Sequence, residues 1–265
     1  MSLASDHDPL WICNLGTVAY RDGVELQEAL QARRQAEQVP DTLLLLEHPP
    51  VYTRGRRASD AELTLGEDFY RERGIEIVAT DRGGRVTYHG PGQLVGYPIM
   101  RVVDVLSHLR TMEAAIIDAL AQDGIAARSR CEEGPDWTGV WVQERKIASL
   151  GVHIAHGVST HGFAINVVND LTPFSWIVPC GLSGVSMTSV QSELGHAPAG
   201  GLPAFRERVA MSFCAAQART GRHVTPAQLG LAPRAQAAGV QVTGAQASGA
   251  QMMDVQAGAP AAVAA

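Results

Sequence analysis

Two residues in the sequence are candidates for nucleophilic chemistry, one cysteine and one lysine. Cys180 lies between Pro179 and Gly181 after an apolar run, so a tight turn would present its thiol rather than pack it. A thiol is mostly protonated at neutral pH, and a nucleophilic cysteine needs an adjacent cation or base. The other interpretation of Cys180 is a small buried side chain, which is the ordinary state of a free cysteine.

Lys146 is the only lysine among 21 basic residues. Arginine keeps its proton in proteins, whereas lysine can release one. A lone lysine in an arginine-rich chain indicates a need for an amine, although a surviving surface lysine would give the same count. Opposite charges ~4 Å apart attract by roughly 4 kcal/mol at an effective dielectric of about 20, enough to stabilise a thiolate. We therefore expect Cys180 and Lys146 to meet in the folded chain.

A glycine-rich segment runs from Arg82 to Gln93 and includes His89. Glycines let the backbone approach a ligand closely and expose N–H donors. The segment matches neither GxxxxGK[ST] nor GxGxxG, so it is no standard nucleotide-binding motif. Its composition is poor for a helix or a strand. We expect either a ligand-binding loop or a structural glycine-rich hairpin.

A strand-like run at 161–167 begins with a histidine. Alternating apolar residues would place His161 on the same face as Phe163. A histidine on such a face is most often a hydrogen-bonded core residue, and a general base is the alternative. His153, His156 and His161 have no acidic or cysteine partners at ligand spacing, so no metal site is expected.

The elements that must position these residues mix helices and strands. Helical patterns cover residues 23–38, 104–122 and 203–219. Strand candidates are Leu43–Glu47, Ile75–Ala79, Leu94–Ile99, Trp137–Val142, Ile147–Ile154 and Val158–Val167. Tight connections join the last three into an antiparallel meander. The pattern predicts an α+β fold with a mixed, largely antiparallel sheet flanked by helices.

Composition limits the class of protein further. The 265 residues are 46% hydrophobic and 18% charged, as in globular proteins. The net charge of -6 argues against a nucleic-acid partner, and no apolar run is long enough to cross a membrane. The N-terminus lacks a basic region before an apolar stretch, and the four cysteines show no CxxC. We expect a cytoplasmic protein with free thiols, built from a catalytic domain (1–222) and a low-complexity, disordered tail (223–265).

Five segments together resemble one known family. In chain order they are LLLLEHPPVYTRGRR (43–57), RGGRVTYHGPGQLVGYPI (82–99), KIASLGV (146–152), HGFAINV (161–167) and PCGL (179–182). Their combination and order make the signal far more specific than any one of them. The chain is similar to the octanoyltransferases of lipoate biosynthesis, which move an octanoyl group from acyl carrier protein to a lipoyl-domain lysine.

The resemblance implies a fold like the catalytic module of biotin and lipoate protein ligases, and a ping-pong mechanism. Cys180 would form the acyl thioester and Lys146 would activate it, with no cofactor and no metal. His161 could have a supporting role. The resemblance implies that the acyl-binding site is lined by Arg82, Gly83, Gly84, Arg85, Val86, Thr87, Tyr88, His89, Ser149, Leu150, Gly151, Gly162, Phe163 and Ala164.

The partners implied are octanoyl-acyl carrier protein as donor, and as acceptors the lipoyl domains of 2-oxoacid dehydrogenase complexes and the glycine cleavage H protein. The enzyme is expected to be a monomer. Arg54, Arg56 and Arg57 could meet an acidic carrier, or could form a solvated loop. Three alternatives stay open: an ATP-dependent lipoate or biotin ligase, a cysteine hydrolase with His89 or His161 as base, and a non-catalytic acyl-protein binding module.

Overall fold

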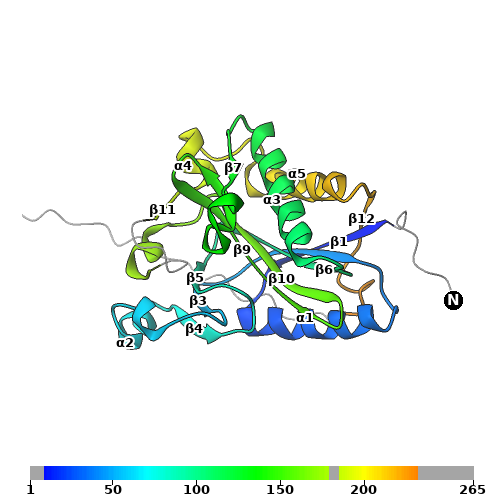
Figure 1. Ribbon diagram of the computed structural model, residues 1–265, viewed down its shortest axis with the longest axis horizontal. Coiled ribbons are helices and arrows are strands. Elements are labelled where there is room, and N and C mark those ends of the chain that lie inside the picture. Colours follow the sequence, from blue (N-terminus) through cyan, green and yellow to red (C-terminus); the bar gives the residue numbers. More distant parts are fainter. Residues whose placement is uncertain (1–8, 179–184, 232–265) are drawn as a thin grey trace, which may run out of the picture.

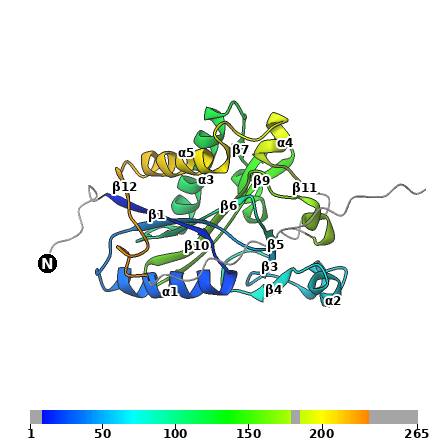
Figure 2. The ribbon, with the colours of Figure 1, turned by 180° about the vertical axis from the view of Figure 1, so that it is seen from behind.

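The computed structural model describes residues 9–178 and 185–231. Two sheets, five α-helices and short 3₁₀ segments make up this part of the chain (Figures 1 and 2). The elements are β1 (Leu10–Thr17), α1 (Tyr20–Gln35), β2 (Thr42–Glu47), β3 (Val51–Arg54), η1 (Asp60–Glu62), α2 (Glu67–Arg71), β4 (Glu76–Ala79), β5 (Val86–His89), β6 (Gln93–Ile99), α3 (Val105–Gln122), β7 (Arg128–Ser129), η2 (Cys131–Glu133), η3 (Pro135–Trp137), β8 (Gly139–Val142), β9 (Arg145–Ala155), β10 (Val158–Asn166), η4 (Thr172–Trp176), β11 (Ser186–Met187), α4 (Val190–Leu194), α5 (Gly201–Ala216) and β12 (Gly221–His223).

The large sheet has the strand order β12-β1-β2-β6-β10-β9-β8-β7, and β11 pairs with β9. The pairs from β2 through β6, β10, β9 and β8 to β7 are antiparallel, whereas β1 is parallel to both β2 and β12. The predicted meander of β8, β9 and β10 is therefore confirmed. So is the mixed, largely antiparallel sheet.

Helices cover both faces of the large sheet. Figure 1 shows α3 and α5 on one side of the sheet and α1 on the other. The leucine run of β2 explains how one strand serves both layers: Leu43 and Leu45 join the α3 and α5 core, while Leu44 and Leu46 join the opposite core with Leu30 of α1. A strand buried on both faces is continuously apolar rather than alternating.

The predicted helices correspond to α1, α3 and α5, with ends that differ by a few residues. The α3 helix begins where Asp104 accepts a hydrogen bond from the backbone N–H of Ser107 at 2.6 Å, as an N-cap does. Its buried stripe includes Met112, Ile116 and Leu120 and packs against α5. The strands β1, β3, β5, β7, β11 and β12 were not predicted.

The glycine-rich segment contains a strand, β5 (Val86–His89), although its composition is poor for one. This strand pairs with β3 in a small three-stranded sheet of order β4-β3-β5. The glycines lie outside the strand, where Gly84 and Gly92 take positive φ angles of 91° and 86°. They form the turns at the two ends of the strand. The composition of the segment is therefore typical of a loop, although its central residues pair with β3.

The packed part of the chain continues past residue 222, which is the predicted end of the catalytic domain. Val224 and Leu229 are buried against the α1 side of the large sheet. The N–H of Val224 donates to the carbonyl of Ile12 at 2.9 Å. Residues 232–265 lie outside the described part of the chain.

Candidate active site

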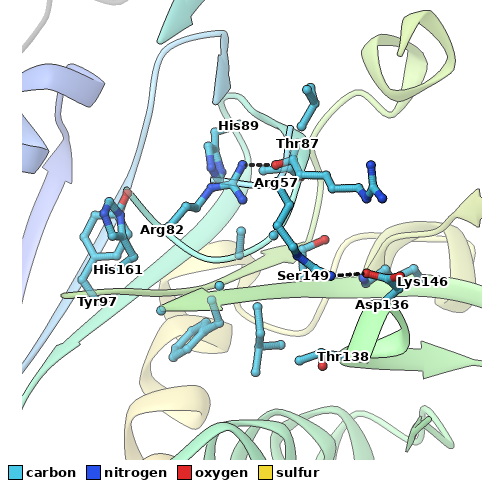
Figure 3. A pocket seen from close by; sticks show the side chains of 18 of the residues that line it. Arg57, Arg82, Thr87, His89, Tyr97, Asp136, Thr138, Lys146, Ser149 and His161 are labelled. Carbon is cyan, nitrogen blue, oxygen red and sulfur yellow. Dashed lines mark hydrogen bonds and ion pairs between the residues drawn. The ribbon is translucent and has the colours of Figure 1, made fainter. Parts of the chain in front are cut away.

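A pocket lies between the glycine-rich segment and the adjoining strands β9 and β10. It encloses about 630 Å³, part of it open to solvent. Figure 3 shows Lys146 and Asp136 at one end, His161 and Tyr97 at the other, and Arg82 above the strands between them. The lining residues are Tyr20, Arg57, Arg82, Gly84, Arg85, Val86, Thr87, His89, Tyr97, Pro135, Asp136, Thr138, Lys146, Ser149, Leu150, Gly151, His161, Gly162, Phe163 and Ala164.

The pocket brings together most of the residues that the sequence predicts for the acyl-binding site. Two of the predicted residues, Gly83 and Tyr88, do not line it. Gly83 lines a groove that adjoins the pocket. Tyr88 is buried against Tyr52 and Phe174 in the core of the small sheet and does not line the pocket. Which lining residues bind an acyl group stays a prediction.

Lys146 is almost fully buried, with 2% of its surface exposed. The sheet holds its backbone on both sides, because Lys146 is the Cα partner of Trp141 in β8 and of Met187 in β11. Its Nζ lies 5.2 Å from the centre of the Trp141 ring, a cation–π distance. A side chain at Gly139 would collide with Lys146, since a Cβ there would lie 2.5 Å from Lys146 Cε. The absence of that Cβ leaves room for the amine.

Cys180 lies outside the described residues, so its distance from Lys146 stays a prediction. The described chain on either side of it is anchored near the pocket. Before it, the N–H of Val178 donates to the carbonyl of Glu62 at 3.0 Å. A few residues after it, Met187 pairs with Lys146.

The other three cysteines differ from a presented thiol. Cys13 and Cys214 are buried, and burial raises the pKa of both thiols, that of Cys13 to about 11. Both are therefore poor nucleophiles at neutral pH. Cys131 is exposed, but it lines the adjoining groove and not the pocket.

Arg82 organises the glycine-rich segment from inside. Its guanidinium donates to the Oγ1 and carbonyl oxygen of Thr53 on β3 and to the carbonyl oxygens of Gly83 and Arg85, at 2.7–3.1 Å. Several N–H groups pointing at carbonyls fix a loop that has few side-chain contacts of its own. Arg82 is 8% exposed and also lines the pocket.

Glu62 links the same segment to the chain that leads to Cys180. Its carboxylate accepts from Arg85 at 2.8 Å and from the backbone N–H of Val86 at 3.1 Å, while its carbonyl holds Val178. The hydrogen bond to Glu62 raises the pKa of the Arg85 guanidinium. Glu62 is 4% exposed, so the bonded carboxylate is shielded from water.

The histidine end of the pocket departs from the predicted strand pattern. His161 has a φ of 57°, in the left-handed region, which interrupts the alternation of β10. Its ring lies against Tyr97, whose core is on the α1 side of the sheet, whereas Phe163 packs on the α3 and α5 side. The expectation that His161 and Phe163 share a face was therefore wrong.

The ring of His161 is fixed by an acid outside the pocket. Its Nε2 lies 2.8 Å from Asp81 Oδ1 and 3.3 Å from Thr80 Oγ1, and His153 contacts the second oxygen of Asp81. Both hydrogen bonds hold the pKa of Asp81 far below its usual range. Burial lowers the pKa of His161 even though Asp81 acts in the opposite direction. We infer a neutral His161 ring that donates from Nε2.

Two more buried histidines lie beside this end. His48 Nδ1 faces the carbonyl of Val18 at 2.6 Å, so it must donate, and Nε2 then accepts from the Tyr97 hydroxyl at 2.7 Å. His89 Nδ1 lies 2.7 Å from Gln93 Oε1. Burial lowers the pKa of His48 to about 4 and that of His89 well below its ordinary value. The three imidazoles at this end are thus uncharged at neutral pH, while the Asp81 carboxylate behind His161 is ionised.

Sequence reasoning missed five lining residues: Tyr20, Tyr97, Pro135, Asp136 and Thr138. Asp136 forms an ion pair with Arg57 at 2.8 Å, and Arg57 had been noted only as part of a basic cluster. Tyr97 lies within a segment used for the family resemblance, which is the signal that could have found it. Tyr20 begins α1, and the other three lie in or directly after the 3₁₀ segment η3, where no periodic pattern indicates a site.

Within residues 9–178 and 185–231, no group of three or more His, Cys, Asp or Glu side chains is arranged to hold a metal ion. No helix within the same residues is long and apolar enough to cross a membrane.

Comparison with known proteins places the chain in a family. A model of the lipoyl protein ligase A/B catalytic domain matches residues 19–214. An octanoyltransferase of Rubrobacter xylanophilus is 48% identical over 185 residues, which cover 68% of this chain and 82% of that protein. An octanoyltransferase of Solibacter usitatus is 50% identical over 173 residues, 64% of this chain and 77% of that protein. The chain belongs to the octanoyltransferase family.

Solved structures show that this octanoyltransferase-family chain has the lipoate protein ligase fold. A bipartite lipoate protein ligase from Thermoplasma acidophilum, studied with its E2 lipoyl domain, aligns with a TM-score of 0.63 at 19% identity, covering 83% of this chain and 88% of that one. A lipoate-protein ligase A bound with ATP aligns at 0.62 and 19% identity, covering 83% and 89%. The family and the fold predicted from the sequence segments are both confirmed.

Proposed function

We propose that this protein transfers an octanoyl group from acyl carrier protein to the lysine of a lipoyl domain, through a thioester on Cys180. The observation that carries the proposal is the position of Lys146. The chain's one lysine is buried at the end of a pocket lined by the segments that mark the octanoyltransferase family. A buried amine that can exchange a proton is what activation of a neighbouring thiol requires.

In the first half-reaction, Lys146 as a neutral amine takes the proton of the Cys180 thiol. The thiolate attacks the carbonyl carbon of the octanoyl thioester, and the carbon–sulfur bond to the carrier's pantetheine breaks. The departing thiolate takes the proton from the Lys146 ammonium. The products are octanoyl-Cys180, a neutral Lys146 and a carrier with a free thiol.

In the second half-reaction, the neutral amine of the acceptor lysine attacks the same carbonyl carbon. The Cys180 thiolate leaves, and Lys146 accepts the proton that the new amide nitrogen loses. An arginine could not accept that proton, because its ordinary state is already fully protonated. The amide is stable, so the second step drives the transfer forward.

The pocket offers an apolar wall for the acyl chain. Leu150, Phe163 and Ala164 line it, and two glycines, Gly151 and Gly162, keep the strands beneath it free of side chains. Burying six methylenes and a methyl contributes roughly 5 kcal/mol at about 0.8 kcal/mol per group. The uncharged histidine end can accept the tail, because no ionised imidazole there would lose its hydration.

The alternatives are weaker on the same observations. The relatives named octanoyltransferase are 48% and 50% identical to this chain. The aligned ligases are only 19% identical to it, so they support the fold and not the activity. A hydrolase would need a histidine base next to Cys180. His161 lies at the end of the pocket opposite to Lys146, with its Nε2 held by Asp81 (Figure 3).

The test is an intact-mass measurement. Incubation with octanoyl-acyl carrier protein and no acceptor should add one octanoyl group, and peptide mapping should locate it at Cys180. The adduct should form without ATP and should disappear when a lipoyl domain is added. Full activity of Cys180→Ser, or a strict need for ATP, would reject the mechanism. The variant Cys214→Ala is the matched control and should keep wild-type acylation, because Cys214 lies in α5 and lines neither the pocket nor the adjoining groove.

A further inference from the structure

A second hollow, which we call the entrance groove, adjoins the pocket. It encloses about 1370 Å³ including its solvent-open part. Its lining residues are Arg57, Gly83, Gly84, Val105, Leu106, Leu109, Arg110, Cys131, Gly134, Pro135, Thr138, Leu150, Gly151 and Val152. Several of them, among them Arg57, Gly84 and Leu150, also line the pocket, so the two hollows share part of their walls. A substrate arm that reaches Lys146 from solvent can run along this groove.

One wall of the entrance groove is unusually apolar for a surface. It is the first turns of α3, where Leu106 is 68% exposed and Val105 is 43% exposed. The neighbouring Val103 is fully exposed as well. Few large hydrophobic residues are exposed in the described part of the chain, and most of those that are exposed lie within residues 103–106. A local concentration of exposed apolar side chains marks a contact surface.

The lining of the groove also includes two arginines, Arg57 and Arg110, and no aspartate or glutamate. Arg57 pairs with Asp136, and Arg110 pairs with the buried Glu113 at 2.8 Å. A guanidinium has five N–H donors, so one carboxylate partner leaves donors for a second anion. Two arginines attract a phosphodiester and repel the ammonium of an acceptor lysine.

We propose that the entrance groove holds the phosphopantetheine arm of the acyl donor. This inference rests on the proposed function, since it assumes a thioester donor whose carbonyl reaches the Lys146 end of the pocket. The arm has the chemistry that the groove offers: an anionic phosphodiester for Arg57 and Arg110, and a branched aliphatic segment for the α3 wall. Its amides can pair with backbone groups of the glycine-rich segment, where Gly83 and Gly84 have no side chains in the way.

The test changes the charge of one exposed residue that lines the groove and not the pocket. Leu106→Glu places a carboxylate at the α3 wall, and Leu106→Lys places an ammonium of similar length there. Each variant is assayed for formation of the octanoyl-enzyme with three donors: octanoyl-acyl carrier protein, octanoyl-coenzyme A and octanoyl-N-acetylcysteamine. The last donor lacks the phosphate and most of the arm. Met211→Glu, at a 50% exposed residue of α5, is the matched control.

The expected result is a split between donors. Leu106→Glu should lower kcat/KM about tenfold for the two phosphorylated donors, because one unit charge is added near the phosphodiester. Leu106→Lys should keep or raise that kcat/KM. Neither variant should alter the reaction of octanoyl-N-acetylcysteamine, and Met211→Glu should match the wild type with all three.

Three results would overturn the inference. Equal loss with the short donor would mean that the substitution damages the pocket. Wild-type kinetics of Leu106→Glu with every donor would mean that the arm takes another route. A raised KM for the lipoyl domain with unchanged donor kinetics would assign the groove to the acceptor. Failure of the proposed function looks different: wild-type protein would then form no octanoyl-enzyme with any donor.

Discussion

The two ends of the pocket place their titratable groups in different surroundings. At one end a single amine, Lys146, is buried in the sheet and faces the ion pair of Asp136 and Arg57 (Figure 3). At the other end His48 and His161 are buried, hydrogen-bonded and kept neutral by desolvation. Both ends contain titratable groups of similar burial. The difference lies in their neighbours: the Lys146 end contains the Asp136–Arg57 ion pair, whereas His48 faces a carbonyl and a hydroxyl and His161 faces the Asp81 carboxylate.

Under the proposed function, the comparison teaches how one pocket would combine proton transfer with binding of an aliphatic chain. A group that must gain and lose a proton needs partners that stabilise its charged form. An apolar tail needs neighbours that do not lose hydration when it arrives. Separating the two requirements along the length of the pocket satisfies both. Each of the following changes tests one side of this division.

The largest effect is expected at the amine end. Lys146→Arg keeps a positive charge but removes the ability to exchange a proton, so octanoyl transfer to a lipoyl domain should fall by about 10²–10⁴-fold. The rate of acceptor octanoylation measures it, and thermal melting verifies that the variant folds. Near-wild-type transfer by Lys146→Arg would show that charge alone suffices there.

The histidine end should respond to acid through stability rather than turnover. The folded pKa of His48 is about 4 against roughly 6.5 in an unfolded chain, so the unfolded state takes up the proton first. Stability contributed by neutral His48 is therefore present above pH 6.5 and is lost as the pH falls towards 4, by about 3 kcal/mol in total. Urea unfolding at pH 7.5 and pH 4.5 measures the loss. His48→Gln should show a smaller loss over the same range, and an identical one would remove His48 as its source.

A smaller effect is expected from the residue that makes room for the amine. Gly139 has a φ of 144°, and an added Cβ would lie 2.5 Å from Lys146 Cε and 2.6 Å from the carbonyl oxygen of Ala148. Gly139→Ala should cost about 1–3 kcal/mol of stability and should displace the amine, which lowers transfer. Gly124→Ala is the matched control, because Gly124 also has a positive φ but no atom lies within 4 Å of the added Cβ. Its transfer rate should stay at the wild-type level.

The smallest effect is expected from the acid behind the histidine end. Asp81 raises the pKa of His161, against the stronger effect of burial. Asp81→Asn should therefore move the pKa of His161 further down and leave the ring neutral at pH 7.5, with transfer close to the wild-type rate. An NMR titration of the His161 ring measures the shift. A large loss of transfer would mean that the charge of Asp81 takes part in the reaction.

The sequence predicted the main architecture because periodic burial determines it. The 3.6-residue stripe of α3 and the meander of β8, β9 and β10 follow from local patterns of apolar residues. The segments that line the pocket were also recognised, and the structure brings their strands side by side. What these parts share is a signal contained within a few adjacent residues.

The parts that sequence reasoning missed depend on contacts between distant residues. The left-handed backbone at His161 places its ring on the face of the sheet opposite to Phe163. No local sequence pattern predicts this change. The β5 strand forms because β3 pairs with it, despite glycines at both ends. The sequence does not distinguish Arg82 from the other arginines of this segment. Its role depends on hydrogen bonds that it donates to Thr53, a residue of another strand.

The parallel pairing of β1 with β12 has a practical consequence for how this enzyme can be joined to other things. Leu10 and Gly221 are direct partners at one edge of the large sheet, while Lys146 belongs to β9, near the opposite edge. The strands β1 and β12, the first and last of the sheet in chain order, thus lie together at this edge. Fluorophores, affinity tags or surface tethers attached at this edge would lie away from the Lys146 end of the pocket.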